Sequence, residues 1–281
     1  MNWTKQFFTR LYHEPMGFFG MILVALVILS ALFAPFLTTH DHNALDIANR
    51  LAGPSAEHWM GTDQLGRDVF SRVVMGSRIA VWVALVTVSM SLGIGLVLGM
   101  MAGYGPKWLD AALLLLFDTL RSFPTIMFAL ALVTVFGPSL QTVIIVIVAT
   151  TFPVYGRMVR TQTQALGNNE FIVAEEAMGA GMIRILGIHI LPNIIGPLFI
   201  VASMDIPVVV TIEAGLSFLG VGVRPPTPSW GSILNDGYAY IRNTPWIIIF
   251  GGLPLIVTTL GFTFLGESLR DIFDPKLRRD L

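Results

Sequence analysis

The chain has 281 residues, of which 54% are hydrophobic and only 12% are charged, and its net charge is −1. Soluble domains carry about 25% charged residues, so this composition predicts an integral membrane protein. The near-zero net charge gives no electrostatic basis for nucleic-acid binding. The absence of cysteine excludes disulfides and cysteine-ligated metal centres.

The first long apolar segment covers residues 17–37, after Lys5 and Arg10. A basic start followed by an apolar run is also typical of a signal peptide, whose apolar core is about 7–15 residues long. This segment has 21 residues, and no A-x-A-like cleavage site follows it. We therefore predict a retained first membrane span.

Further segments supply the roughly 20 apolar residues with which a helix crosses a bilayer. The apolar run 111–155 is too long for one crossing, and Gly137-Pro138 divides it because a helix usually ends before a proline. Lipid offers no partner to free backbone groups, so each span must be helical. The predicted fold class is an all-α integral membrane protein with one transmembrane domain over residues 1–281. Its six spans are placed at about 17–37, 79–103, 111–136, 139–155, 194–219 and 246–265.

An even number of spans places both termini on the same side of the membrane. With a cytoplasmic N-terminus, ten Lys and Arg residues lie inside and six outside, which the positive-inside rule favours. We predict that both termini are cytoplasmic. This orientation gives two long outer loops, 38–78 and 220–245, and one long inner segment, 156–193.

The inner segment contains a helix too short to span the membrane. It is predicted from Glu170 to Met178, with Asn168-Asn169 offering the N-cap and Gly179 as the left-handed residue that ends it. A second short helix is expected at about 182–190. Such a segment is either an interfacial amphipathic element or a docking element for a cytoplasmic partner. Its apolar residues at helical spacing are Phe171, Ala174, Ala177 and Met178.

The pattern Ala174-x-x-Ala177-x-Gly179, followed by Leu191-Pro192, resembles the EAA coupling loop of ABC importer permeases. Val173 and Glu175 depart from the acid and the alanine of that motif. In that family the loop sits in a groove of the ATPase subunit. The resemblance therefore implies ATPase-coupling roles for Phe171, Ala174, Glu175, Ala177, Met178, Gly179, Leu191 and Pro192.

Three other blocks resemble the dipeptide/oligopeptide/nickel branch of these permeases, and in particular its second, C-type subunit. They begin at Gly61, Glu213 and Gly266. The resemblance implies the type I importer fold with cytoplasmic coupling helices, in the bacterial inner membrane. It also implies a second homologous permease subunit, two ABC ATPases and an external solute-binding protein as partners. The outer motif consists of Gly61, Thr62, Asp63, Gly66, Arg67 and Asp68.

No Gly-Lys pair occurs anywhere in the chain, so the phosphate-binding loop of P-loop ATPases is missing. We expect no cofactor on this chain and no catalysis by it, with ATP and Mg²⁺ used by a partner. Two other classes of protein are alternatives. A stand-alone ion-coupled carrier would not need the inner docking element, and an intramembrane hydrolase would need a histidine base that no predicted span supplies.

Charged residues inside predicted spans are costly and usually face protein or water. Asp118 and Arg121 are three residues apart and are predicted to pair on one helix face, although Arg121 could instead snorkel to the surface. Glu213 is assigned either to contact with the partner permease or to contact with the solute. The candidates for the translocation path or its gate are Asp118, Arg121, Asp205 and Glu213.

Several outer and intramembrane features favour structural roles. The Gly61–Asp68 motif is interpreted as a turn whose acidic and basic residues cap and pair locally, rather than as a phosphate or metal site. Trp230 is placed at the membrane interface. Gly95, Gly99 and Gly103, at four-residue spacing, predict close helix contact.

The outer loop also carries His40, His42 and His58. An H-x-H pair can bind a metal, but exposed loop histidines are more often simply solvated, and no metal site is assigned. The predicted function is that of a permease subunit in an ATP-driven importer of a small solute, with di- or oligopeptides as the first choice. Nickel, glutathione or an opine remain alternatives for the same machinery.

Overall fold

The computed structural model describes residues 14–273. The basic residues at both termini, on which the orientation partly rests, lie outside these residues. Within them the regular secondary structure is helical, with one isolated bridge between Thr62 and Asp68, and loops connect the helices. The predicted all-helical membrane fold is confirmed. Five helices are long and apolar enough to span a membrane, and a sixth span results if one bent helix pair is counted as a single span.

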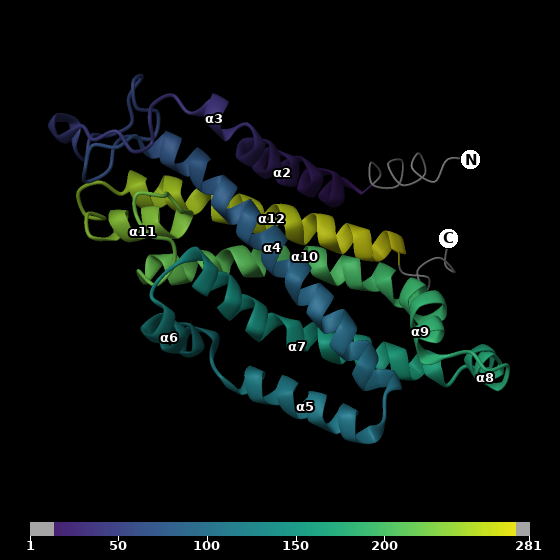
Figure 1. Ribbon diagram of the computed structural model, residues 1–281. Coiled ribbons are helices and arrows are strands. Elements are labelled where there is room, and N and C mark those ends of the chain that lie inside the picture. Colours follow the sequence, from purple (N-terminus) through teal and green to yellow (C-terminus); the bar gives the residue numbers. More distant parts are fainter. Residues whose placement is uncertain (1–13, 274–281) are drawn as a thin grey trace. The chain divides into compact units, whose positions relative to one another are not determined.

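Figure 1 shows the elements in chain order. Between α3 and α4 lies a single 3-10 turn, η1, and a π-helical segment, η2, joins α9 to α10. The α-helices are α2 (Pro15–Leu32), α3 (Ala34–Leu37), α4 (Val69–Tyr104), α5 (Lys107–Ser122), α6 (Thr125–Phe136), α7 (Leu140–Gly167), α8 (Glu170–Ala177), α9 (Met182–Arg184), α10 (Leu191–Phe218), α11 (Trp230–Tyr238) and α12 (Trp246–Phe273). The turn η1 covers Ile47–Asn49 and η2 covers Ile185–Ile190.

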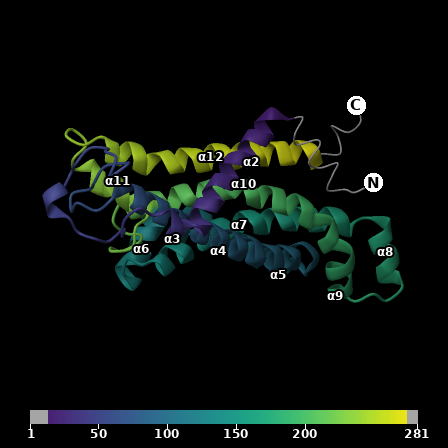
Figure 2. The ribbon, with the colours of Figure 1, turned by 90° about the horizontal axis from the view of Figure 1, so that it is seen from above.

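The chain forms two compact units, each described here by itself. In the first unit α2 packs along α12 and crosses it (Figure 2). Two glycines make this contact close: a Cβ on Gly20 would lie 2.6 Å from the backbone nitrogen of Leu265, and one on Gly261 would lie 2.9 Å from Leu23 Cβ. The first unit comprises Met1–Leu85, Ala129–Val143 and Ser203–Leu281.

The second unit comprises Val86–Phe128 and Ile144–Ala202, and within it α4 and α7 lie in close contact. The predicted glycine face makes this contact. A Cβ on Gly99 would lie 2.5 Å from the carbonyl oxygen of Gly156, and one on Gly103 would lie 2.6 Å from Thr163 Cβ. The close helix approach predicted from the four-residue spacing is therefore confirmed.

The predicted third span, 111–136, is not one straight helix. It breaks between Ser122 and Thr125, and the two halves, α5 and α6, are bent by 90°. Pro124 lies in the break; it has no backbone N–H to donate and disfavours a helical conformation in Phe123. Hydropathy did not predict the bend, because the residues on both sides of this proline are apolar.

Two other helices extend beyond the apolar segments that predicted them. Helix α4 begins at Val69 rather than near residue 79. Hydropathy missed its first turns because they carry Arg72 and Arg78. Helix α7 runs to Gly167, past the predicted end at residue 155, and includes Arg157 and Arg160. Hydropathy detects the lipid-spanning part of a helix and omits its polar extensions.

Candidate functional site

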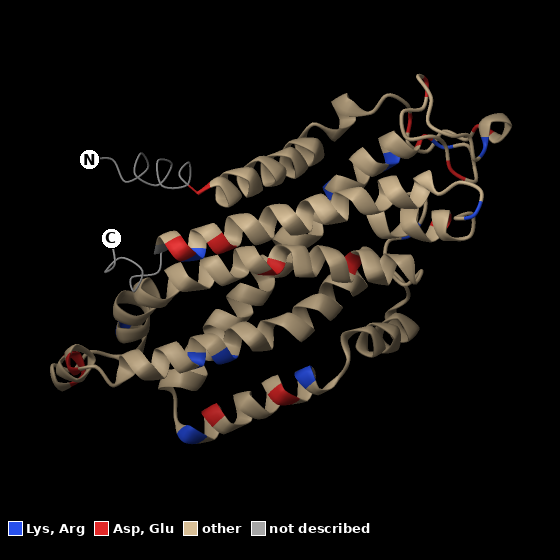
Figure 3. Cartoon of the chain, turned by 180° about the vertical axis from the view of Figure 1, so that it is seen from behind, with Lys and Arg blue, Asp and Glu red and all other residues tan. Residues whose placement is uncertain are grey.

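Exposed apolar residues outside the spans include several on the short helix α8 and its flanks, residues 168–181, called here the α8 segment. Ile172 is fully buried and holds the helix to the second unit. Phe171 and Met178 are 46% and 74% exposed. The α8 segment thus presents apolar side chains that are wholly or partly exposed, while its acidic residues share the same helix (Figure 3).

The end of α8 follows the predicted geometry. Gly179 has a φ of +84°, and its N–H donates to the carbonyl of Glu176 over 2.9 Å. The N–H of Ala180 donates to the carbonyl of Glu175 over 3.0 Å, which completes a Schellman motif. At the other end Asn169 is the N-cap residue, but its side chain makes no capping hydrogen bond. The predicted N-cap position is therefore confirmed.

Two side chains from outside the α8 segment hold it, and the sequence revealed neither. The hydroxyl of Tyr104, at the end of α4, donates to Glu176. His189 Nε2 lies 3.6 Å from Glu175 Oε1. Glu175 is the residue that departs from the alanine of the coupling motif, so this departure provides an acidic group for the internal contact with His189.

The predicted separate helix at 182–190 is instead continuous with the following span. Met182–Phe218 forms one helical stretch, with η2 as a π-helical section inside it. Pro192 has no N–H for the preceding turn, and Asn193 Nδ2 donates to the carbonyl of His189 over 2.6 Å. Leu191 is half-buried and Pro192 exposed. The α8 segment is therefore followed directly by a helical stretch long enough to span a membrane.

The charged residues of the spans have partners other than those predicted. Asp118 forms an ion pair with Arg157 of α7, not with Arg121, which is exposed. The predicted Asp118–Arg121 pair is thus wrong, because a partner on a neighbouring helix is invisible in helical spacing. Arg160 Nη2 likewise donates to Asp110 Oδ2 over 2.6 Å.

The two acidic residues of α10 differ in exposure. Glu213 is fully buried, and Ser217 Oγ donates to its Oε1 over 2.7 Å. It therefore offers no surface to a solute or a partner in this structure. Asp205 is half-buried. Glu213 is better explained as an internal polar contact than as part of an open path.

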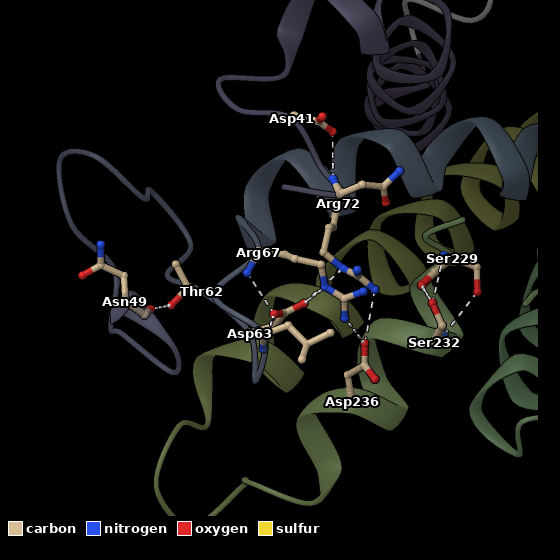
Figure 4. A network of polar contacts seen from close by, with 11 residues as sticks. Asp41, Asn49, Thr62, Asp63, Arg67, Arg72, Ser229, Ser232 and Asp236 are labelled. Atoms are coloured by element: carbon tan, nitrogen blue, oxygen red, sulfur yellow. Dashed lines mark hydrogen bonds and ion pairs between the residues drawn. The ribbon is translucent and has the colours of Figure 1, made fainter. Parts of the chain in front are cut away.

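The outer motif builds a buried ion-pair network, shown in Figure 4 and called here the charged cluster: Asp63, Arg67, Arg72 and Asp236. Arg67 Nε lies 2.7 Å from Asp63 Oδ2. The two arginines also reach Asp236 Oδ2, at 3.1 and 3.2 Å. Burial raises the pKa of Asp236, and the facing charges of Arg72 and Arg67 partly oppose this rise.

Backbone geometry explains why this motif needs its glycines. Gly61 and Gly66 have φ values of +76° and +74°, and a Cβ on Gly66 would lie 1.6 Å from the carbonyl oxygen of Asp46. Thr62 Oγ1 accepts from the N–H of Ala52 over 2.9 Å. Asp68 caps α4, since its Oδ2 accepts from Ser71 N over 2.8 Å. The predicted local capping and pairing is confirmed, but the sequence did not reveal Asp236.

The position predicted for Trp230 is wrong. It is only 2% exposed, and its Nε1 donates to the carbonyl of Val73 over 3.0 Å. Gly76 leaves the space for its ring, since a Cβ there would lie 2.9 Å from Trp230 Cδ1. The indole therefore closes the core between α4 and α11 rather than marking a membrane interface.

Several helices long and apolar enough to span a membrane, with an exposed short helix that leads into one of them, define a multi-pass membrane protein. The family model for the inner membrane component of binding-protein-dependent transport systems matches residues 95–279. The model for the N-terminal transmembrane domain of oligopeptide transport permease C matches residues 2–54. The chain belongs to the family of binding-protein-dependent transport system inner membrane components, in its dipeptide/oligopeptide permease C group.

Curated relatives match the chain over nearly its whole length. The dipeptide transport system permease protein DppC of Alkalihalophilus pseudofirmus is 39% identical, over 98% of this chain and 90% of that protein. The glutathione transport system permease protein GsiD of Pectobacterium atrosepticum is 36% identical, over 98% and 91%. The oligopeptide transport system permease protein OppC of Bacillus subtilis is 34% identical, over 98% and 90%.

A solved structure shares the fold. The chain is similar to an inward-facing structure of the MetNI methionine ABC transporter, with a TM-score of 0.56 and 19% identity, over 72% of this chain and 97% of that one. This likeness confirms the predicted type I importer fold.

Proposed function

We propose that this chain is one of two permease subunits in an ATP-driven importer of di- or oligopeptides, and that the α8 segment is where an ATPase subunit docks. The observation that carries the proposal is the exposed apolar surface of that segment, formed by Phe171, Ala174 and Met178, together with its anchor Ile172. Large exposed apolar side chains on an ordered helix mark a binding surface for another protein. The missing phosphate-binding loop means that ATP and Mg²⁺ act on that partner.

The fold provides a route from docking to transport. ATP binding would close a pair of ATPases and move the α8 segment with them. Met182–Phe218 continues from this segment as one helix, so the movement passes into a span. The importer then alternates between two states, and ATP favours one of them by its different affinity for each.

In this proposal the α8 segment and both termini face the cytoplasm. The loop 38–68 and α11 face the opposite side of the inner membrane, where a solute-binding protein delivers the solute. The second permease is a homologue of this chain, and the solute passes between the two. The positive-inside count supports this orientation.

Peptides are proposed as the solute because the relatives named for dipeptide and oligopeptide transport match the chain over nearly its full length. A relative named for glutathione transport is similar to a comparable degree, and glutathione is itself a tripeptide. Nickel and opines stay as alternatives. None of the charged residues of the spans selects among these solutes by its geometry.

The test is reconstitution of this chain with its co-expressed partners in lipid vesicles, followed by uptake of a labelled dipeptide delivered by the binding protein. We expect uptake that requires ATP, and co-purification of an ATPase with this chain. Failure of the chain to associate with any ATPase would contradict the proposal. ATP-dependent uptake of another solute but not of peptides would support the proposal that the chain belongs to an importer. It would contradict the proposal that the solute is a peptide.

A further inference from the structure

Two histidines of the outer loop lie together in space. The rings of His40 and His58 have centroids 4.7 Å apart. Glu57 completes the group: one ligand atom from each of these three residues lies within 4.8 Å of the others. His42, the second histidine of the H-x-H pair in the sequence, does not belong to this group.

The backbone holds both histidines in place. The N–H of His40 donates to Ser71 Oγ over 3.1 Å. His58 lies in a tight turn, where its N–H donates to Ser55 Oγ over 3.0 Å and its carbonyl accepts from Ser55 N over 2.8 Å. The two rings are therefore brought together by ordered segments, which lowers the entropic cost of binding a ligand between them.

Asp68 orients His58 in the manner of a metal site. Its side chain is 1% exposed, and its Oδ1 accepts from Nδ1 of His58 over 2.9 Å. Histidines that bind metals almost always donate their other ring N–H to a carboxylate or a carbonyl, which fixes the ring and makes it a stronger ligand. Asp68 also caps α4, so this ring orientation is tied to the start of a span.

We propose that His40, His58 and Glu57 bind a divalent transition-metal ion of the zinc type on the outer face of this chain. Two imidazole nitrogens and one carboxylate oxygen form a His₂Glu donor set, which suits Zn²⁺ and leaves a fourth position for water or an external ligand. Carboxylate-rich oxygen sets would instead suit Mg²⁺ or Ca²⁺. The ion would fasten residue 40 to the turn at 55–58, above the N-terminus of α4. This site does not depend on which solute the importer carries.

The experiment is a zinc titration of the whole assembly, purified through a tag without histidine and treated with a chelator. Bound zinc is measured by competition with a chromophoric chelator. We expect the parent assembly to bind one more equivalent of zinc than the H40A/H58A variant. Glu57→Gln should weaken this binding by at least about tenfold, because even losing a residue that only supports a metal ligand costs about 10–100-fold. The H42A variant is the matched control, and it should bind zinc like the parent.

Folding is monitored in the same samples. Zinc should raise the thermal transition of the parent and of H42A but leave that of H40A/H58A unchanged. If H40A/H58A is unstable without zinc, His58→Gln replaces it, because glutamine preserves a polar side chain of similar reach. Cobalt substitution gives a second readout, since tetrahedral Co²⁺ bound by these groups absorbs visible light. Equal zinc stoichiometry in the parent and in H40A/H58A, or equal loss in H42A, would overturn the proposal.

Discussion

The charged cluster and the α8 segment differ in which kind of side chain they bury and which they expose. In the charged cluster, polar groups are buried and satisfied by one another: Asp63 is 2% exposed and lies against two arginines. In the α8 segment, apolar groups are exposed and only Ile172 is buried. Buried charges that pair internally belong to the architecture of the chain, whereas exposed apolar residues on an ordered helix indicate a surface completed by another molecule.

The largest expected effect comes from Gly179→Pro. Proline requires a φ near −65°, whereas Gly179 has +84° and donates its N–H to Glu176. The turn that ends α8 cannot then form. We expect membrane insertion and yield like the parent, and loss of ATP-coupled uptake below detection in the vesicle assay.

Gly181→Pro is the matched control. Gly181 has a φ of −75° and ψ of 158°, which proline adopts readily, and a Cβ there meets nothing within 4 Å. Uptake by this variant should be close to parental. Equal loss of uptake in both proline variants would show that the turn at Gly179 has no special role.

The next largest effect is on stability, at the charged cluster. Asp63→Ala removes the more buried of the two carboxylates that Arg67 and Arg72 share, and removing one member of a buried ion pair costs about 3 kcal/mol or more. Chemical denaturation of the purified chain in detergent should show this loss. Asp236→Ala should cost less, since the side chain of Asp236 is 24% exposed. A larger loss of stability for Asp236→Ala than for Asp63→Ala would show that burial does not determine how much each acidic residue contributes to the stability of the cluster.

A smaller loss of stability is expected where α4 meets α7 within the second unit. Gly99→Ala places a Cβ 2.5 Å from the carbonyl oxygen of Gly156, and overpacking of this kind costs about 1–3 kcal/mol. Gly93→Ala, on the same helix, meets nothing within 4 Å and should be neutral or slightly stabilising. The pair is compared by thermal denaturation in the same detergent, and equal effects would contradict the close contact.

The smallest effect should come from Met178→Ala. Met178 is 74% exposed, so its truncation should not change the free energy of unfolding of the isolated chain. At a binding surface it should cost about 1 kcal/mol of ATPase affinity, a factor of about five. Titration of the ATPase into the reconstituted permease measures this. A loss of stability with unchanged affinity would assign Met178 to the core instead.

Most of the membrane fold could be predicted because its cause is local. Each span is an apolar run, and the glycine spacing in α4 translates directly into a close contact. The bend at Pro124 was missed because apolar residues continue on both sides of it. The length of α7 was missed because Arg157 and Arg160 find acidic partners on α5, which hydropathy does not record.

The candidate sites likewise combine features that the sequence predicts with features that it does not. The helix stop at Gly179 was predictable, since a glycine after a short amphipathic helix has one common use. Asp236 joins residues far earlier in the chain, and Trp230 bonds to Val73 across the fold. The pairing of His40 with His58 rather than His42 also depends on tertiary contacts. Such contacts leave no periodic signal in one sequence.

The central claim is that the α8 segment is an ATPase-docking surface, and single-cysteine crosslinking tests it most directly. The chain has no cysteine, so one can be introduced without background. Met178→Cys is compared with Trp59→Cys, in the outer loop, where Trp59 is 56% exposed. With a short bifunctional reagent on the assembled importer, we predict a crosslink from M178C to the ATPase and none from W59C. Free labelling of M178C in the assembly, with no crosslink to the ATPase, would contradict the account.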